Sequence, residues 1–322
     1  MKIAVLTSGG DAPGMNAAVR SVTRCALYRG WEVWGVAEGY RGLIAGELRP
    51  LVSRDVGGII DRGGTFLGTS RCPEFREAAG RRRALEVLAD HAIGGLVVIG
   101  GNGSLAGAHD LSAESGLQLI GLPASIDNDL AGTDNSIGFD TAVNTALDAV
   151  DKLRQTADSH HRIFVVEVMG RDCGALAVEV ALAGGAEAAL VPEAGGLGDL
   201  EELAAKLIRN LKMARKKSAV VILAEGAGEA PALAERLARL TGLECRATVL
   251  GHLQRGGAPT SYDRNLASRL GAVAVEQLAA GTDDVMVGLV AAELTVTPLA
   301  DVLAYEHAFN RQEFDLVGIL SH

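Results

Sequence analysis

The chain has 322 residues, of which 48% are hydrophobic and only 4% are aromatic, and it contains 41 glycines. This composition favours a layered α/β protein long enough for two domains, and the formal net charge of −10 disfavours nucleic acid as a partner. The four cysteines form no C-x-x-C pair, which argues against a zinc site or a disulfide framework and for a reducing compartment.

Short apolar runs alternate with segments of helical period along the chain. The expected strands are 3–7, 32–36, 96–99, 117–122, 162–168, 188–191, 219–224 and 245–250. The expected helices include 15–29, 84–91, 141–155, 200–215 and 232–240. Asp199 with Glu202 indicates a helix start, and Gly30 and Gly242 stand where helices are expected to end. This alternation predicts mostly parallel sheets with helices on both faces.

A membrane span is not expected. No secretory pattern precedes the first apolar run, and the longest weakly polar region, 175–192, contains Glu179, Glu187 and two adjacent glycines. We therefore expect a cytoplasmic protein.

Several expected strands run directly into glycine or charged residues. These junctions are 8–11, 100–104, 169–171, 225–226 and 251–257. In open α/β folds, ligands bind beyond the carboxyl ends of the strands. Structural glycines could account for any one junction, but their repetition at one edge indicates a ligand-binding edge.

The segment 123–129, Pro-Ala-Ser-Ile-Asp-Asn-Asp, follows an apolar run and a glycine-rich turn. Taken alone, it is also what an ordinary Asp/Asn turn looks like. A phosphoryl-transfer site, however, needs a base for the attacking alcohol and groups that hold charge, which Ser125, Asp127 and Asp129 could supply. Arginine outnumbers lysine by 24 to six, and its planar fork suits phosphate, although a solvated surface would also account for part of this excess.

Two other phosphate-binding classes fit less well. The chain lacks G-x-x-x-x-G-K-[ST], which excludes a P-loop nucleotidase. Gly101, Gly103 and Gly107 form a set one residue longer than the dinucleotide fingerprint, and the next expected strand ends in Leu122-Pro123 without the acid that would bind ribose. A dehydrogenase is therefore disfavoured.

Five ordered motifs closely resemble the ATP-dependent 6-phosphofructokinases of bacterial type. They lie at 6–16, 62–71, 125–129, 166–171 and 251–257, and the resemblance extends from the first strand to about residue 281. It implies two Rossmann-like three-layer α/β/α domains with mostly parallel sheets. The larger, ATP-binding domain would comprise 1–138 plus 253–304, and the smaller, sugar-phosphate-binding domain 139–252 plus 305–322.

The resemblance implies transfer of the ATP γ-phosphoryl group to the C1 hydroxyl of fructose 6-phosphate. Asp127 matches the general base of the family. Arg171 and the backbone N–H of Gly10 would face the charge on the transferring group, with the Ser125 hydroxyl assisting. Asp129 would lie near the sugar and the metal, although a turn-stabilising role fits it equally well.

The resemblance also assigns the ligand contacts. ATP would lie over Gly10, Tyr40, Arg71, Cys72, Arg76, Gly101, Asn102, Gly103, Ser104 and Gly107. The sugar phosphate would contact Ser125, Ile126, Asp127, Asp129, Arg162, Met169, Gly170, Arg171, Glu225, Arg246, His252 and Arg255. In the family, the residues matching Arg162 and Arg246 reach in from a neighbouring subunit, and a homotetramer is the family expectation. ADP or phosphoenolpyruvate would bind as an effector at Arg20, Arg24, Arg154, Gly185, Glu187 and Lys216, although a solvated helix face would also explain the first two.

The chain departs from the family at Asn102, where aspartate is usual and is associated with Mg²⁺ on the ATP phosphates. We expect weaker magnesium coupling, because the site loses one negative charge. A catalytically weak phosphosugar-binding or regulatory subunit is therefore an alternative, disfavoured because Asp127 and Arg171 are retained. Pyrophosphate-dependent relatives are a second alternative, but they usually carry a carboxylate at the Gly103 position and a lysine at the Ala124 position. The small residues in this chain favour ATP.

Overall fold

The computed structural model of the chain describes residues 1–157, 162–213, 218–305 and 308–321. These residues divide into two compact units. Unit 1 comprises 1–125, 129–140 and 255–307, and unit 2 comprises 126–128, 141–254 and 308–322, apart from the undescribed positions. Among the described residues, no helix has both the length and the apolar character needed to span a membrane.

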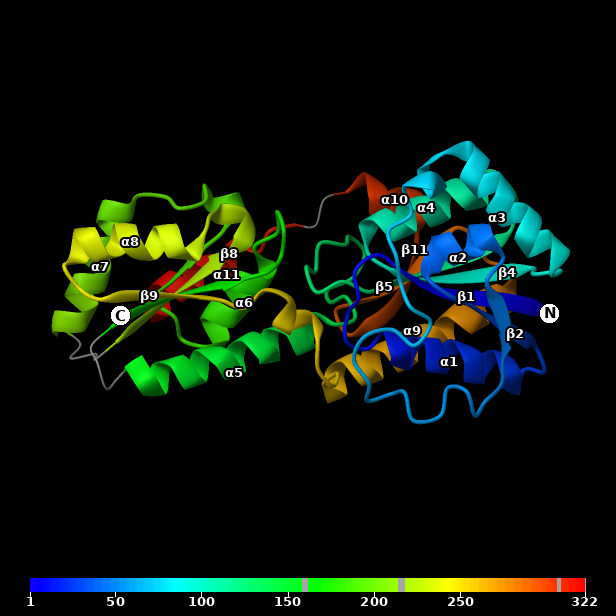
Figure 1. The fold of residues 1–322 in the computed structure, drawn as a ribbon, viewed down its shortest axis with the longest axis horizontal. Helices are drawn as coiled ribbons and strands as arrows, with labels where there is room; N and C mark the ends of the chain where they lie inside the picture. Colours follow the sequence, from blue (N-terminus) through cyan, green and yellow to red (C-terminus); the bar gives the residue numbers. More distant parts are fainter. Residues whose placement is uncertain (158–161, 214–217, 306–307, 322) are drawn as a thin grey trace. The chain divides into compact units, whose positions relative to one another are not determined.

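Unit 1 is built on a seven-stranded sheet, drawn in Figure 1, with the order β11-β10-β5-β4-β1-β2-β3. Its strands are β1 (Lys2–Ser8), β2 (Glu32–Val36), β3 (Leu48–Leu51), β4 (Gly95–Gly100), β5 (Gln118–Pro123), β10 (Val285–Val290) and β11 (Glu293–Pro298). The five inner strands pair in parallel, and the two edge strands are antiparallel to their neighbours. The carboxyl ends of β1, β4 and β5 therefore lie side by side.

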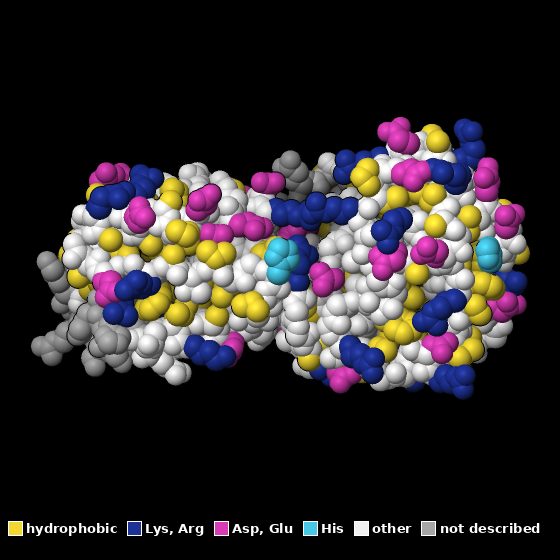
Figure 2. All heavy atoms as spheres, in the orientation of Figure 1, with side chains coloured by type: hydrophobic (Ala, Val, Ile, Leu, Met, Phe, Trp, Pro, Cys, Tyr) yellow, Lys and Arg dark blue, Asp and Glu magenta, His cyan; other side chains and the backbone are white. Residues whose placement is uncertain are grey.

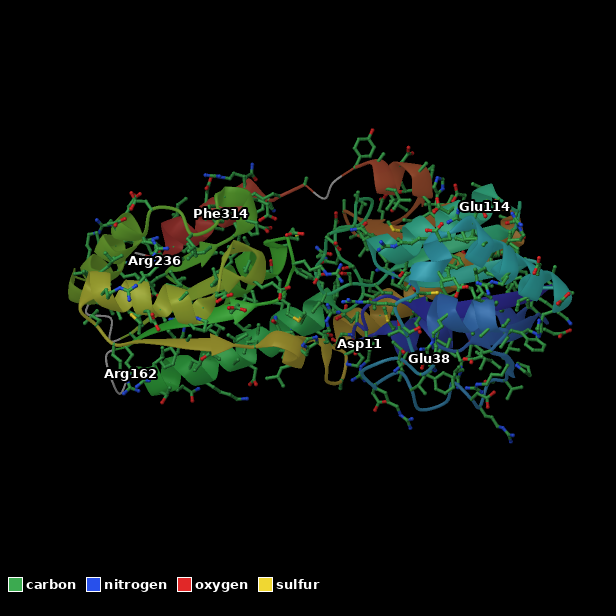
Figure 3. All side chains as sticks on the ribbon, turned by 45° about the horizontal axis from the view of Figure 1, so that its top comes forward. Asp11, Glu38, Glu114, Arg162, Arg236 and Phe314 are labelled. Carbon is green, nitrogen blue, oxygen red and sulfur yellow. The ribbon has the colours of Figure 1, made fainter. Side chains whose placement is uncertain are left out.

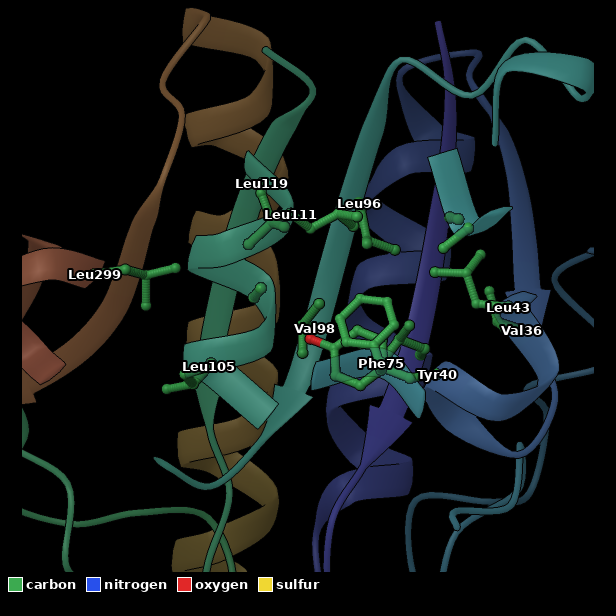
Figure 4. Close-up of a cluster of buried hydrophobic side chains, with 14 of the residues drawn as sticks. Val36, Tyr40, Leu43, Phe75, Leu96, Val98, Leu105, Leu111, Leu119 and Leu299 are labelled. Atoms are coloured by element: carbon green, nitrogen blue, oxygen red, sulfur yellow. The ribbon is translucent and has the colours of Figure 1, made fainter. Parts of the chain in front are cut away.

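Helices cover both faces of this sheet (Figure 1). The helices α1 (Met15–Tyr28) and α9 (Ser261–Ala280) pack together on one face. The other face carries α2 (Gly39–Ala45), α3 (Ala78–Asp90), α4 (Asn102–Ala113) and α10 (Leu299–Ala304). Figure 4 shows the core between this second group and the sheet, where leucines surround the stacked rings of Tyr40 and Phe75.

Unit 2 is built on a smaller, four-stranded sheet with the order β7-β8-β6-β9, all in parallel. Its strands are β6 (Ile163–Val168), β7 (Ala188–Leu190), β8 (Ala219–Ala224) and β9 (Cys245–Val249). The helices of unit 2 are α5 (Phe139–Ala157), α6 (Ala175–Ala183), α7 (Leu200–Met213), α8 (Ala230–Thr241) and α11 (Arg311–Leu320). The apolar faces of α7 and α8 bury Leu203, Leu207 and Leu233 against β6 and β8, while α11 packs on α6.

The prediction of an α/β fold with mostly parallel sheets is confirmed. All eight expected strands form, and each end lies within one residue of the expected position. The five expected helices also form, although α3 begins six residues before the expected start at 84, and 214–215 of the fourth lie outside the described residues. The Asp199 carboxylate accepts a hydrogen bond from Glu202 N at 3.0 Å, as the sequence indicated. Gly30 and Gly242 end their helices with φ of 76° and 69°, which glycine adopts without strain. On the face drawn in Figure 2, acidic and basic side chains of the described residues are interspersed over both units.

Candidate active site

The turn after β1 in unit 1 brings glycine and arginine together. Gly9 has φ of 89°, and a Cβ on Gly10 would come within 2.5 Å of Nη1 of Arg255. The Arg255 guanidinium donates to the carbonyl oxygen of Asp11 at 3.1 Å, in the turn where Figure 3 labels Asp11. The absence of a side chain at position 10 thus lets a cation lie against the end of β1.

The glycine-rich segment after β4 forms the start of α4. Asn102, Gly103 and Ser104 lie in its first turn, after Gly101. The first N–H groups of a helix have no intrahelical partner, and together with the helix dipole they favour a bound anion. A Cβ on Gly103 would meet nothing within 4 Å, so the space above this turn is open. The start of α4 therefore has the chemistry of a phosphate cradle.

Tyr40 holds this helix start from the protein interior. Its ring is only 4% exposed and stacks on Phe75 with a centroid separation of 3.7 Å. Its hydroxyl donates to the carbonyl oxygen of Ser104 at 2.6 Å. Burial, with a smaller effect of Asp110, raises the pKa of Tyr40 far above its usual value, so the hydroxyl stays a donor. A Cβ on Gly107 would lie 3.1 Å from the Phe75 ring, so glycine permits the close packing of α4 on this pair.

The turn after β5 lies against the start of α4 because β4 and β5 pair in parallel. A Cβ on Gly101 would lie 3.7 Å from Cβ of Ser125. The Asn102 amide nitrogen donates to the carbonyl oxygen of Asp129 at 3.0 Å. Because a carbonyl oxygen can only accept, this bond leaves Oδ1 of Asn102 as an acceptor for another group. Oδ1 of Asp129 is buried without a hydrogen-bond partner among the described residues.

The remaining predicted ATP contacts of unit 1 lie around residues 71–76. Arg71 and Arg76 are exposed, and Cys72 is half-buried against the core. Pro73 begins the short 3₁₀ helix η1 (Pro73–Arg76), which places Phe75 under Tyr40. The Cys72 side chain therefore packs against the core cluster that includes this aromatic pair.

In unit 2, the predicted base and the predicted cation lie together. Oδ2 of Asp127 is 3.4 Å from Nε of Arg171, and the carboxylate side chain is 5% exposed while the arginine side chain is 61% exposed. Ile126, next to Asp127 in the chain, and Met169, two residues before Arg171, are both buried. A shielded carboxylate next to an open guanidinium is an arrangement that can take a proton on one side and hold an anion on the other.

The turn that carries Arg171 is shaped by Glu225. One carboxylate oxygen of Glu225 accepts from Gly170 N at 3.1 Å and from Arg171 N at 2.8 Å. Arg171 has a left-handed φ of 52°, which costs a residue with a side chain about 1 kcal/mol or more. A Cβ on Gly226 would come within 2.1 Å of the Arg171 carbonyl oxygen. Glu225, predicted to contact the sugar, thus also holds the strained turn beside Asp127.

Gln254 binds the main chain just after the end of β6. It is fully buried, and its side-chain oxygen accepts from Met169 N at 2.9 Å. It lies in the same short helix, η4 (Gly251–Arg255), as His252, which is exposed. This bond ties the end of β6 to the segment that carries His252.

Arg162 and Arg246 lie at the opposite end of the sheet of unit 2. Both bind Glu244, whose Oε2 is 2.6 Å from Nε of Arg162 and whose Oε1 is 2.6 Å from Nη2 of Arg246. These hydrogen bonds, first that of Arg162, hold the pKa of Glu244 below its usual value. Arg162 precedes β6, while Met169 follows it, and a strand of this length spans about 20 Å. Figure 3 labels Arg162 at this far end. Within one chain, the two arginines therefore do not join Met169 and Arg171.

Three predicted effector residues lie together in unit 2. Arg154 donates to the carbonyl oxygen of Gly185, which has φ of 61°. Glu187 follows two residues later, is fully buried, and accepts from Val220 N at 2.6 Å. Arg20 and Arg24 lie one turn apart on α1 in unit 1, with Arg24 exposed. Lys216 lies outside the described residues.

Sequence reasoning missed several side chains that organise these segments, notably Glu244, Gln254, Asn16 and Thr69. Asn16, Thr69 and Gln254 lie inside the motifs noted above, so their motif membership was the available signal. Their partners are backbone groups remote in sequence, as in the 2.6 Å bond from Phe66 N to Oδ1 of Asn16. No local pattern specifies such a partner.

Comparison with known proteins is consistent across sequence and structure. Residues 2–278 match the sequence model of the family described as Phosphofructokinase. The chain is 49% identical over 319 residues to the ATP-dependent 6-phosphofructokinase of Clostridium acetobutylicum, and 50% identical over 320 residues to that of Bacillus pumilus. Each alignment covers 99% of both chains.

The structure of phosphofructokinase from Saccharomyces cerevisiae superposes with a TM-score of 0.88 at 38% identity. The match covers 94% of this chain but only 45% of the yeast chain. On the matched family model and the full-length relatives, this chain belongs to the phosphofructokinase family.

Proposed function

We propose that this chain is an ATP-dependent 6-phosphofructokinase. It transfers the γ-phosphoryl group of ATP to the C1 hydroxyl of fructose 6-phosphate, giving fructose 1,6-bisphosphate and ADP, as a step of glycolysis. Full-length relatives at about half identity carry that name. The observation on this chain that carries the proposal is the shielded Asp127 carboxylate 3.4 Å from the open Arg171 guanidinium.

In this mechanism, Asp127 takes the proton of the C1 hydroxyl as the new bond to phosphorus forms. Arg171 and the N–H of Gly10 hold the charge of the transferring group, with the Ser125 hydroxyl assisting. The strained Arg171 turn, fixed by Glu225, keeps the guanidinium in place without rearrangement during the reaction. The work of the protein is positioning and charge stabilisation, as phosphoryl transfer requires.

The unit 1 residues support a nucleotide site. The phosphates would bind at the start of α4 and near Arg71 and Arg76, and Gly107 with Tyr40 would border the base. The open space over Gly103 and the small Ala124 favour ATP over pyrophosphate as donor. On this assignment unit 1 is the ATP-binding domain and unit 2 the sugar-phosphate-binding domain.

A magnesium ion fits beside Asn102. The amide of Asn102 offers Oδ1, and Asp129 offers a buried oxygen without a hydrogen-bond partner among the described residues, both of which suit a hard cation. No group of three or more His, Cys, Asp or Glu side chains in the described part of the chain could hold a metal by itself, so ATP phosphates and water would complete the coordination. When bound, Mg²⁺ would neutralise charge on the phosphates.

The sugar phosphate would contact Met169, Gly170, His252 and Arg255 from one chain. Arg162 and Arg246 would serve the site of a neighbouring copy, since they lie at the far end of β6 from Met169. An oligomer, the homotetramer of the family expectation, then completes each site. Arg154, Gly185 and Glu187, with Arg20, Arg24 and Lys216, would bind ADP or phosphoenolpyruvate as an effector.

The donor assignment has a direct test. With fructose 6-phosphate present, we expect turnover with ATP and at most about one per cent of that rate with pyrophosphate. Pyrophosphate has no nucleoside, so the binding energy between the base and the protein is missing. A coupled assay of fructose 1,6-bisphosphate with ATP, pyrophosphate or no donor measures this. Turnover with pyrophosphate alone would overturn the donor assignment, and no turnover with either would favour a phosphosugar-binding subunit.

Asn102→Asp is expected to lower the free Mg²⁺ concentration for half-maximal activity by about three- to tenfold, because it restores one negative charge at the cation. The measurement is the rate against free Mg²⁺ at fixed ATP, together with direct binding of Mn²⁺ in the presence of ADP. The control, Asn135→Asp, adds the same charge in unit 1 and also removes an amide donor, here to the Tyr262 hydroxyl. Identical curves for Asn102→Asp and the unsubstituted chain would show that Asn102 does not weaken the magnesium coupling.

A further inference from the structure

The segment 62–71 in unit 1 contains no helix or strand, yet side-chain hydrogen bonds fix both of its ends. We name this segment the 62–71 strap. It belongs to the blue loop in Figure 1 that passes α1 and leads towards α3. Its first part carries no backbone ladder, so its shape depends on individual hydrogen bonds from neighbouring elements.

Asn16 fixes the beginning of the strap. The Asn16 side chain is 2% exposed, and it donates to the carbonyl oxygens of Arg62 at 3.0 Å and Gly63 at 3.4 Å. Its Oδ1 accepts from Phe66 N at 2.6 Å. One amide in the first turn of α1 thus satisfies three backbone groups of the strap.

Two threonines fix the end of the strap to β1 and to the turn that follows it. Thr7, fully buried in β1, donates to the carbonyl oxygen of Gly68 at 2.8 Å. Thr69, in the strap, donates to the carbonyl oxygen of Gly9 at 2.7 Å. The second bond joins the strap to the Gly9–Gly10 turn, where the transferring phosphoryl group is proposed to lie.

Arg71 follows Thr69 by two residues. It is exposed, and no hydrogen bond or ion pair of its guanidinium is seen in the part of the chain that the structure describes. The place from which it can reach a phosphate is therefore set by the main chain. Ser70, next to Arg71, donates to the carbonyl oxygen of Glu38 at 3.0 Å, so Thr69 is the side chain that ties this part of the strap to the Gly9–Gly10 turn itself.

We propose that Thr69 is a positioning residue for the nucleotide: its hydroxyl fixes Arg71 relative to the Gly9–Gly10 turn, and so sets the affinity for the ATP phosphates. This proposal rests on the proposed function. Asn16 and Thr7 anchor the strap on which Thr69 acts. Arg255, the proposed sugar-phosphate contact beside this turn, is held by its own bond to the Asp11 carbonyl oxygen, so the main effect of Thr69 is expected on the nucleotide.

The test is Thr69→Val, which keeps the shape of the side chain and removes only the hydrogen bond. Loss of one such bond lowers binding by about two- to tenfold. We expect the KM for ATP to rise by that factor, with kcat, the KM for fructose 6-phosphate and the thermal midpoint little changed. Thr69→Ser keeps the hydroxyl and is expected to restore the KM for ATP to within about twofold.

Thr133→Val is the control for general destabilisation, since Thr133 in unit 1 is buried, donates to the Asn135 carbonyl oxygen at 2.8 Å and also accepts from Leu289 N at 3.2 Å, so its loss disturbs more bonds than that of Thr69. ADP would also bind at the proposed effector site, so the calorimetric titration uses a non-hydrolysable ATP analogue, which reads the affinity of the donor site without turnover and tests the proposal even if the chain proves inactive on fructose 6-phosphate. An unchanged affinity for the ATP analogue in Thr69→Val would overturn the proposal. So would equal losses in Thr69→Val and Thr133→Val, because both would then reflect general destabilisation.

Discussion

Asp127→Asn is expected to lower kcat by about two to four orders of magnitude, the usual effect of removing a general base. Asparagine has nearly the same shape, which matters because the Asp127 side chain is 5% exposed and a smaller residue would leave a gap. It cannot take the proton of the C1 hydroxyl. The KM for fructose 6-phosphate should change by less than about fivefold, because the sugar contacts after β6 and on η4 remain.

The measurement is steady-state kinetics with ATP and fructose 6-phosphate, combined with a calorimetric titration of the sugar phosphate. Asp284→Asn is the control: the same chemical change in unit 1, where Asp284 accepts from His109 at 2.8 Å, away from the site. It should leave kcat within about twofold, as expected for a partly exposed pair. An Asp127→Asn protein that turns over at the rate of the unsubstituted chain would rule out the base.

The strands at the centre of both sheets were predictable because each is a short apolar run flanked by glycine or charge. Three strands of unit 1 were not predicted, namely its edge strands β3 and β11 and the inner strand β10, whereas both edge strands of unit 2 were. β3 contains Pro50, and proline is tolerated only at an edge, so the segment gives a poor strand signal. β10 is a plain apolar run that sequence reasoning passed over, and β11 needs β10 as a partner.

The helix α4 was missed for a different reason. Its sequence contains Gly103 and Gly107, which lower helix propensity by roughly 1 kcal/mol each, so it was interpreted as a turn. In the fold, the cost is offset by packing, because the Tyr40 and Phe75 rings occupy the space that a side chain at position 107 would need. The glycines that made this helix hard to predict thus belong to the proposed nucleotide site.

The site could be predicted as a set of segments but not as an arrangement. Parallel pairing of β4 with β5 brings Gly101 and Ser125 together, which follows from the strand order once it is known. The bonds from Glu225 to two successive N–H groups, and from Asn16 to three strap groups, join residues about 50 positions apart. Such contacts depend on loop conformation, which propensity and periodicity do not encode.

Arg171→Gln is expected to lower kcat by about two to three orders of magnitude, the usual effect of removing one group that holds transition-state charge. Thermal stability should change little. The Arg171 side chain is 61% exposed, and an ion pair with such an exposed partner contributes about 1 kcal/mol or less. The strained backbone is held by Glu225 and not by the guanidinium, so glutamine can occupy the same turn. A large kinetic effect with a small stability effect would mark Arg171 as part of the reaction.

Arg171→Lys separates charge from geometry, because lysine keeps the charge but not the planar fork, and an intermediate kcat is expected. Arg239→Gln is the control: the same change in unit 2, at an exposed arginine that pairs with Glu235 at 3.8 Å. The measurements are kcat, both KM values and the thermal midpoint for all three proteins. If Arg171→Gln changed only the KM for fructose 6-phosphate, Arg171 would bind the substrate without stabilising the transferring group. If Arg171→Gln mainly lowered the thermal midpoint, the ion pair between Arg171 and Asp127 would serve stability and not the reaction.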